Sequence, residues 1–256
     1  MDFQEENYKQ KFRDYKCCVI IPTYNNATTL KNVIEGVLDY CNDIVVVNDG
    51  STDKTREILQ QFKSLHIIHQ EPNQGKGMAL RTAFKEADQM GYQNAITIDS
   101  DGQHDVKDLP VFLNKMQAAP GSIIIGARNM EQASVPGKSS FGHKFSNFWF
   151  WFETGVHVPD TQSGYRLYPL NALQGFKWYT VKYEFEIEVI VRAVWRGVPI
   201  TAVPVSVYYA PKETRISHFR PFKDFSRVSV LNVVLVTLTL LYYKPKKIIQ
   251  GFKKKV

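Results

Sequence analysis

The sequence predicts an α/β domain in which a mainly parallel sheet is flanked by helices. Short runs rich in Val and Ile show almost no alternation of apolar and polar residues, which is typical of strands buried on both faces of a parallel sheet. These runs alternate along the chain with stretches of helical pattern, as in doubly wound domains. Ligands of such domains bind beyond the carboxyl ends of the strands. The loops that follow the strands are therefore where a site is expected.

The expected elements follow one another regularly through the first half of the chain. Strands are expected at residues 17–21, 44–47, 67–69, 95–98 and 123–126, and helices at 28–40, 52–63, 77–90 and 106–117. After residue 130 the pattern is less regular, with an aromatic-rich stretch at 141–152, a polar loop at 160–166, a helix at 183–196 and a strand at 201–208. The aromatic stretch fits a lipid–water interface and a core helix equally well.

Composition and charge divide the chain into three segments. We expect an N-terminal extension at 1–16, one main domain at 17–211 and a basic, amphipathic segment at 212–256. The last segment has eleven Lys and Arg residues against two acidic ones, a charge of +9, whereas the rest of the chain carries −2. The basic residues surround an uncharged apolar run at 228–243. This arrangement favours an anionic membrane surface as partner and no nucleic acid.

The apolar run at 228–243 is shorter than the roughly 20 residues that cross a bilayer, and it contains several polar residues. We therefore favour a docked or in-plane helix over a span. The first sixteen residues are polar and lack the apolar core of a signal peptide.

The strongest candidate site follows the expected strand at 95–98. Asp99 and Asp101, with Gln103 two residues further on, lie on alternate positions of an extended segment and can point to the same side. Mg²⁺ or Mn²⁺ takes one or two carboxylates together with substrate phosphates, so these residues predict a divalent metal bound to a diphosphate. The alternative is an ordinary Asp-Gly turn.

Three further loops connect a strand to a helix at the same edge of the expected sheet. Pro22-Thr-Tyr24-Asn25 ends the first strand, and Tyr24 can form a wall of a base pocket. Asp49 ends the second strand, where its carboxylate can accept bonds from a base or ribose. Lys76 stands in a Gly-Lys-Gly run before a helix, and helix N-termini favour anions.

Taken together, these motifs resemble the inverting family 2 glycosyltransferases of GT-A fold. The motifs are Pro22–Asn25, residues 48–53, 75–77, 99–103, 126–128, 160–166 and 183–188. The resemblance covers nearly all of residues 17–208, and within the family it is closest to the dolichyl- and polyprenyl-phosphate sugar transferases. It implies that residues 17–211 are a catalytic domain. The apolar run and its flanking charges, and not the resemblance, predict a membrane-associating helix within the segment at 212–256.

The resemblance assigns roles to individual residues. It implies that the donor is bound by Pro22, Tyr24, Asn25, Asp49, Lys76, Asp99, Ser100, Asp101 and Arg128, and the metal by Asp99, Asp101 and Gln103. It implies that the acceptor is bound by Gln162, Ser163 and Arg166. Asp160 is the expected base or positioning residue, and Arg166 the expected phosphate-binding residue, so both are counted as catalytic. Asn48 stands where many relatives have a second acidic residue, which leaves no inferred role for this position.

The resemblance also implies a reaction and a location. We expect transfer of a hexose, with inversion, from a nucleotide-sugar to a lipid acceptor such as polyprenyl phosphate. The Thr161-Gln162 pair favours a donor like UDP-glucose. The enzyme is expected in the cytoplasm, peripheral to the inner face of a membrane. Two alternatives stay open: a glycosyltransferase that acts on another lipid or saccharide hydroxyl, and a non-catalytic nucleotide-binding membrane adaptor.

Overall fold

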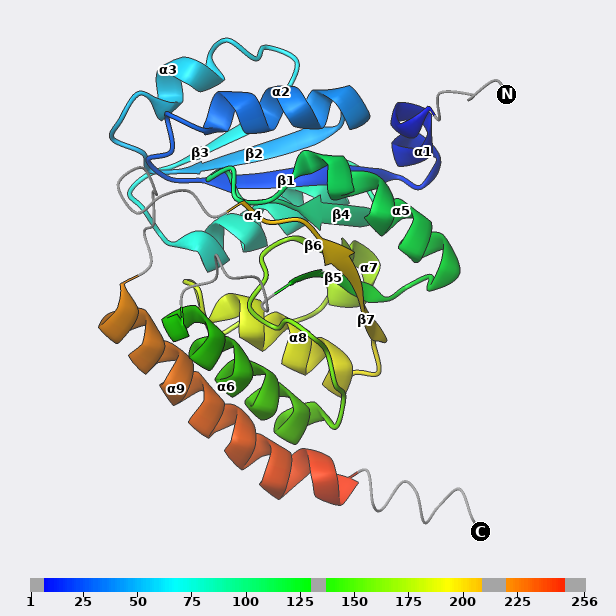
Figure 1. Ribbon diagram of the computed structural model, residues 1–256, viewed down its shortest axis with the longest axis vertical. Helices are drawn as coiled ribbons and strands as arrows, with labels where there is room; N and C mark the ends of the chain where they lie inside the picture. The colour runs from blue at the N-terminus through cyan, green and yellow to red at the C-terminus, as the bar shows by residue number, and fades with distance from the viewer. Residues whose placement is uncertain (1–6, 130–136, 209–219, 247–256) are drawn as a thin grey trace.

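The computed structural model describes residues 7–129, 137–208 and 220–246. Its centre is a seven-stranded sheet of order β3-β2-β1-β4-β6-β5-β7 (Figure 1). The strands are β1 (Cys17–Thr23), β2 (Ile44–Asp49), β3 (His66–Gln70), β4 (Asn94–Thr97), β5 (Ile123–Arg128), β6 (Arg166–Pro169) and β7 (Ile200–Val205). The mainly parallel sheet predicted from the unalternating Val and Ile runs is confirmed.

Helices cover both faces of the sheet. One core forms against α1 (Tyr8–Asp14), α2 (Leu30–Tyr40), α3 (Thr55–Leu59) and α5 (Leu109–Ala118). The other forms against α4 (Lys76–Gln89), α6 (Gly137–Thr154), α7 (Leu170–Leu173), α8 (Phe185–Trp195) and α9 (Pro221–Leu238). Short turns η1 (Val106–Asp108) and η2 (Thr239–Tyr243) precede α5 and extend α9. Alternate residues of β1 belong to the two cores: Cys18 and Ile20 to one, Val19 and Ile21 to the other.

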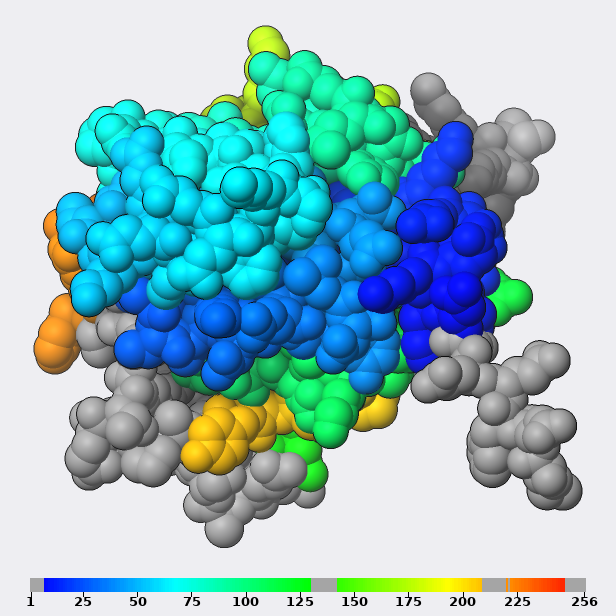
Figure 2. Space-filling model, turned by 90° about the horizontal axis from the view of Figure 1, so that it is seen from above, coloured from blue at the N-terminus to red at the C-terminus, as the bar shows by residue number. Residues whose placement is uncertain are grey.

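The N-terminal extension expected at 1–16 is part of the domain from Tyr8 onward. Helix α1 buries Phe12 completely and packs beside β1. Figure 2 shows dark blue α1 on the same face as the blue and cyan segments that follow it, with the orange start of α9 at the opposite edge.

Strand β6 is antiparallel to both of its neighbours, β4 and β5. It pairs Thr97 with Arg166, and the Thr97 hydroxyl donates to the carbonyl of Gly164 at 2.7 Å. Because β6 runs against β4, the loop that precedes β6 lies at the edge where β4 ends. The polar loop at 160–166 is thereby placed next to the Asp99 loop.

Helices α6 and α9 lie side by side on the lower part of the molecule (Figure 1). The rings of Phe145 in α6 and Phe225 in α9 are 5.6 Å apart. At the other end, the ring of Tyr243 in η2 stacks on that of Trp195 in α8, with 3.9 Å between the centroids. Residues Phe222–Lys246 form a continuous helix of 25 residues, long and apolar enough to cross a membrane, with only 22% of its most apolar window buried. The helix is nevertheless docked against the domain along its length.

Candidate active site

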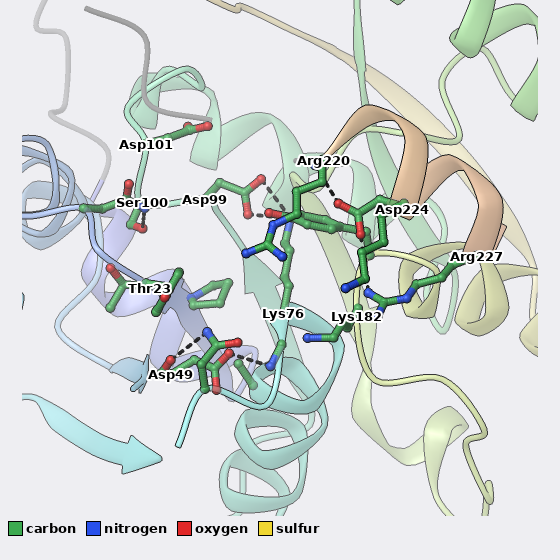
Figure 3. Close-up of a pocket in the computed structure, with 18 of the residues that line it drawn as sticks. Thr23, Asp49, Lys76, Asp99, Ser100, Asp101, Lys182, Arg220, Asp224 and Arg227 are labelled. Atoms are coloured by element: carbon green, nitrogen blue, oxygen red, sulfur yellow. Dashed lines mark hydrogen bonds and ion pairs between the residues drawn. The ribbon is translucent and has the colours of Figure 1, made fainter. Parts of the chain in front are cut away.

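One cavity of about 550 Å³ collects most of the predicted donor-binding and metal-binding residues. It opens at the ends of β1, β2 and β4, where Figure 3 shows Thr23, Asp49, Asp99 and Asp101 facing it. The predicted residues that line it are Pro22, Tyr24, Asp49, Lys76, Asp99, Ser100, Asp101 and Gln103. The loops were therefore placed correctly at one edge of the sheet.

Asp49 shapes the loop between β3 and α4. Its two carboxylate oxygens accept the backbone N–H groups of Gln74 and Gly75, at 2.8 and 2.7 Å. Gly75 has a φ of 101°, a conformation that favours glycine. Asp49 is 3% exposed. Each oxygen has further lone-pair capacity toward the cavity, so Asp49 can hold the loop and also accept a bond from a ligand.

Lys76, at the start of α4, joins two acidic residues from distant segments. Its Nζ lies 2.7 Å from Asp99 Oδ1 and 3.1 Å from Glu186 Oε2. Burial alone would lower the pKa of the Lys76 ammonium, but the two carboxylates outweigh burial and raise that pKa above its usual value. Burial would likewise raise the pKa of Asp99, and the attraction of Lys76 lowers it instead. Both groups stay charged at neutral pH.

Gly164 packs directly against this ion-pair cluster. A Cβ at this position would lie 2.8 Å from both Asp99 Oδ2 and Lys76 Nζ, and 3.1 Å from Glu186 Oε1. A larger residue at this position would have to displace these charged side-chain ends from their present contacts.

The donor set around Asp99 suits a hard cation that also binds a substrate diphosphate. Asp99 and Asp101 both line the cavity, and Asp101 Oδ1 accepts the N–H of Gln103 at 3.0 Å. Among the described residues there is no group of three or more His, Cys, Asp or Glu side chains able to hold a metal. Mg²⁺ or Mn²⁺ on a nucleotide nevertheless usually takes only one or two carboxylates from the protein, and Asp99 and Asp101 provide two along one cavity.

Ser100 and Asn25 support loops within this edge. Ser100 is 1% exposed, and its hydroxyl accepts a bond from Asn26 Nδ2 at 2.7 Å. Asn25 has a φ of 50°, and its side-chain oxygen accepts the N–H of Thr52 at 2.8 Å. Asn25 is absent from the described cavity lining. Its interactions join the loop after β1 to the loop after β2.

Asp160 is fully buried, and its carboxylate accepts hydrogen bonds from Arg128 and from the loop at 160–166. Its carboxylate accepts bonds from Arg128 Nε and Nη2 at 2.7 and 3.1 Å. It also accepts the backbone N–H groups of Arg128, Gln162 and Ser163. Burial would raise the pKa of Asp160, but the Arg128 guanidinium lowers it below its usual value. Asp160 and Arg128, predicted as base and donor ligand, are both outside the described cavity lining. In this geometry the Asp160 carboxylate holds Arg128 and the backbone of its own loop.

Arg166 is also fully buried. Its guanidinium donates to the carbonyls of Ser163, Thr161 and Glu186 and to the hydroxyl of Tyr168, at 2.6 to 3.1 Å. Four of the five N–H bonds of the guanidinium are thus directed into the protein. This placement does not fit the predicted fork to an acceptor phosphate, because the side chain holds the loop together from within.

Gln162 and Ser163, the other predicted acceptor residues, differ in exposure. Ser163 is 1% exposed, and its hydroxyl accepts the N–H of Tyr165 at 3.3 Å. Gln162 is exposed, and its amide donates to the carbonyl of Gly142 in α6. Neither belongs to the described lining of the cavity.

The cavity has a second wall that the sequence analysis did not assign to it. Lys182 and Tyr183 precede α8, and Arg220, Lys223 and Arg227 belong to the start of α9. The last three are among the basic residues around the apolar run at 228–243, for which the sequence predicts an anionic membrane surface as partner. Their spacing of three and four residues is a signal for one helix face, but nothing in the sequence shows which surface that face meets.

Comparisons with known proteins agree with this architecture. A family model described as glycosyl transferase family 2 matches residues 18–175. A UDP-N-acetylglucosamine–dolichyl-phosphate N-acetylglucosaminyltransferase of Methanococcus voltae is 27% identical over 75% of this chain and 85% of its own length. The polyprenol monophosphomannose synthase of Mycolicibacterium smegmatis is 29% identical over 73% of this chain and 76% of its own.

A solved structure of similar fold is the glucosyl-3-phosphoglycerate synthase of Mycobacterium tuberculosis, in complex with Mn²⁺, UDP and phosphoglyceric acid. It superposes with a TM-score of 0.66 at 19% identity, and the match covers 91% of this chain and 80% of the other. The GT-A fold expected from the motifs is confirmed. With the family model matching more than half of its residues, the chain belongs to glycosyl transferase family 2 and is a glycosyltransferase.

Proposed function

We propose that this glycosyltransferase transfers a hexose from a UDP-sugar to polyprenyl phosphate at a membrane surface, with inversion and with a divalent metal. The observation that carries the proposal is the cavity itself. On one wall it has Asp49, Asp99 and Asp101 at the ends of two strands, and on the other it has the cationic start of an apolar helix. A nucleotide-sugar and a phosphorylated lipid are the two substrates that match these walls.

The donor is expected on the wall formed by the strand ends. Pro22, Tyr24 and Asp49 would hold the nucleoside, since they line the cavity at the ends of β1 and β2. Asp99 and Asp101, with Gln103 nearby, would hold Mg²⁺ or Mn²⁺, which neutralises the negative charge that develops on the departing diphosphate. The Mn²⁺ and UDP in the structure of the mycobacterial synthase support a UDP-linked donor.

The reaction is a single in-line displacement. An oxygen of the acceptor phosphate forms a bond to the anomeric carbon while the bond from that carbon to the UDP oxygen breaks, which inverts the configuration. A phosphate monoester is already anionic at neutral pH, so no side chain has to remove a proton. This agrees with Asp160, whose carboxylate is fully buried and paired with Arg128. Asp160 and Arg166 then act by fixing the loop at 160–166 beside Asp99.

The membrane side is expected along α6 and α9. Exposed apolar side chains on these helices are Phe148, Trp151, Phe222, Phe225, Val230, Val233, Val234, Leu238, Leu240, Leu241 and Tyr242. Lys244 and Lys246 follow them. An amphipathic element with basic flanks lies in the interface of an anionic bilayer. The names of two relatives mention dolichyl phosphate and polyprenol lipids, which supports an enzyme that works at a membrane. The location proposed here is peripheral, at the inner, cytoplasmic face.

Nucleotide release tests the proposal. The full chain is supplied with a panel of UDP- and GDP-sugars and Mn²⁺ or Mg²⁺, with and without a polyprenyl phosphate, and Asp101→Asn is the control. UDP release that rises with the lipid, requires the metal and disappears in the variant is the expected result. Release without lipid dependence would move the acceptor to a soluble sugar or hydroxyl. Binding without any turnover would favour a nucleotide-binding adaptor.

A further inference from the structure

Four cationic side chains gather on the wall of the cavity that faces Asp99. Lys182 comes from the segment before α8, and Arg220, Lys223 and Arg227 come from the start of α9. Lys223 and Arg227 share one helix face because they are four positions apart, and Arg220 is the residue that directly precedes the helix. In Figure 3 Lys182 and Arg220 extend from the right-hand wall toward Lys76, Asp49 and Asp99. We call these four residues the cationic wall.

The cationic wall has more positive charge than its neighbours neutralise. Lys76, the other cation of the cavity, is already paired with two carboxylates. Among the described residues that line the cavity beside the cationic wall, Asp224 is the only acidic one. It lies 3.5 Å from Arg227 Nη1. Four cations against one carboxylate leave a net charge of +3 on a concave surface, which favours a multiply charged anion.

Asp224 keeps this wall in place. It is 4% exposed, and its Oδ2 accepts the backbone N–H of Arg220 at 2.7 Å. This bond satisfies an N–H at the helix start, where such groups have no partner within the helix. The first turn of α9 is therefore held with its basic face toward the cavity.

The same helix is basic at its start and apolar further along. After Arg227, α9 exposes Val230, Val233, Val234 and Leu238. A ligand with an anionic head at the cationic wall and a long apolar body along α9 would match both parts. The opposite wall, with Asp99 and Asp101, already provides the metal-binding carboxylates for a nucleotide diphosphate. The cationic wall is thus available for a different phosphate.

We propose that Lys182, Arg220, Lys223 and Arg227 form the subsite for the phosphate of the acceptor, a long-chain lipid phosphomonoester. The inference rests on the proposed function, since it takes the acceptor to be a lipid phosphate. It replaces Arg166, which is directed into the protein, as the group that binds the acceptor phosphate. It also assigns the basic residues at the start of α9 to substrate and not to the membrane surface.

Binding of farnesyl monophosphate below its micelle concentration tests the subsite. The full chain is saturated with UDP and Mn²⁺, and binding is measured by calorimetry for wild type, for Lys223→Gln/Arg227→Gln, and for Lys244→Gln/Lys246→Gln. The last pair removes the same charge from the far end of the same helix. Farnesol, which has no phosphate, is the matched ligand. Thermal unfolding establishes that each variant is folded.

We expect Lys223→Gln/Arg227→Gln to weaken farnesyl phosphate binding at least tenfold. The Kd for UDP should change less than twofold, and farnesol binding should be unchanged. The Lys244/Lys246 pair should leave all three values unchanged. If the Kd for UDP rises instead, the cations belong to the donor diphosphate and the subsite is wrong. If both double variants lose farnesyl phosphate binding equally, the attraction is unspecific charge attraction, and this result would also contradict the subsite.

Binding by the wild type distinguishes a failure of the subsite from a failure of the lipid-phosphate acceptor. If wild type binds farnesyl phosphate and the variant in the cavity binds it equally well, only the subsite fails. If wild type binds UDP but no farnesyl phosphate, the lipid-phosphate acceptor fails, and the subsite fails with it.

Discussion

Replacing Asp160 by Asn tests whether the loop at 160–166 is held by a buried ion pair. The carboxylate is completely inaccessible and accepts five N–H bonds, three from Arg128 and one each from Gln162 and Ser163. An Asn amide has no charge, and its NH₂ group cannot accept any of these bonds. The Arg128 guanidinium, whose side chain is 14% exposed, then loses its counter-charge.

The expected cost follows from this burial. Breaking a buried ion pair by removing one partner costs about 3–5 kcal/mol, so Asp160→Asn should lower the free energy of unfolding by that amount. The exposed pair Arg56–Glu71, with side chains 56% and 70% exposed, is the matched control. Glu71→Gln should cost about 1 kcal/mol or less. Urea denaturation at pH 7 measures both.

The pH dependence gives a second measurement on the same pair. The pKa of Asp160 is lowered in the folded state, because Arg128 outweighs the effect of burial. A lowered pKa stabilises the fold above the unfolded value, about 4, and this contribution disappears as the pH falls below it. Asp160→Asn should therefore lose less stability than wild type between pH 5 and pH 3. A cost at pH 7 no larger than that of Glu71→Gln would refute the reasoning.

Three further outcomes are expected. Gly164→Ala should lower the free energy of unfolding by about 1–3 kcal/mol through overpacking and reduce UDP release, since its Cβ would lie 2.8 Å from the Asp99 carboxylate. The control Gly142→Ala, in α6, has room for a Cβ and should be neutral or slightly stabilising. Burial raises the pKa of Glu153 to about 8, so stability, measured as Tm, should fall between about pH 5 and pH 8, and Glu153→Gln should flatten that slope. Leu235→Ala should cost about 2–5 kcal/mol in urea denaturation, because Leu235 is 2% exposed where α9 packs on the domain.

Each of these has an opposite result. If Gly164→Ala and Gly142→Ala change the free energy of unfolding equally, the close packing of Gly164 against Asp99 and Lys76 does not limit the size of this residue. A Tm profile that is the same in wild type and Glu153→Gln would mean that the carboxyl is not held in an apolar setting. If Leu235→Ala costs no more than the same change at Leu238, which is 40% exposed, then α9 is not part of the folded core in solution.

The cavity wall at the strand ends, where the donor is proposed to bind, was predictable because its residues follow strands directly. The apolar runs located the strands, and the edge rule for parallel sheets brought Asp49, Asp99 and Asp101 together without knowledge of any contact. Lys76 was placed in the cavity by the same rule. Its partner Glu186 was not predicted, since it lies 110 residues away on α8, and only tertiary packing joins the two.

The burial of the polar loop at 160–166 could not be predicted from composition. Asp160 and Arg166 occur in a segment of polar and small residues, which suggests exposure, yet both are 0% exposed. Their burial depends on partners such as Arg128, 32 residues away. The position of Arg220 was equally hidden, because it depends on how α9 folds back onto the domain.

The antiparallel strand β6 has a consequence for how this enzyme can change. The carboxylates proposed to hold the metal and the residues proposed to hold the nucleoside come from before residue 104, whereas the loop at 160–166 and the cationic wall come from residues after 159. Because β6 enters the sheet in reverse, two separate stretches of chain meet at one edge while sharing few covalent neighbours. Insertions or exchanges in the later stretch can therefore alter what is glycosylated while the sugar donor stays the same. A chimera joined within α5, between the two stretches, would combine the donor preference of one relative with the acceptor preference of another.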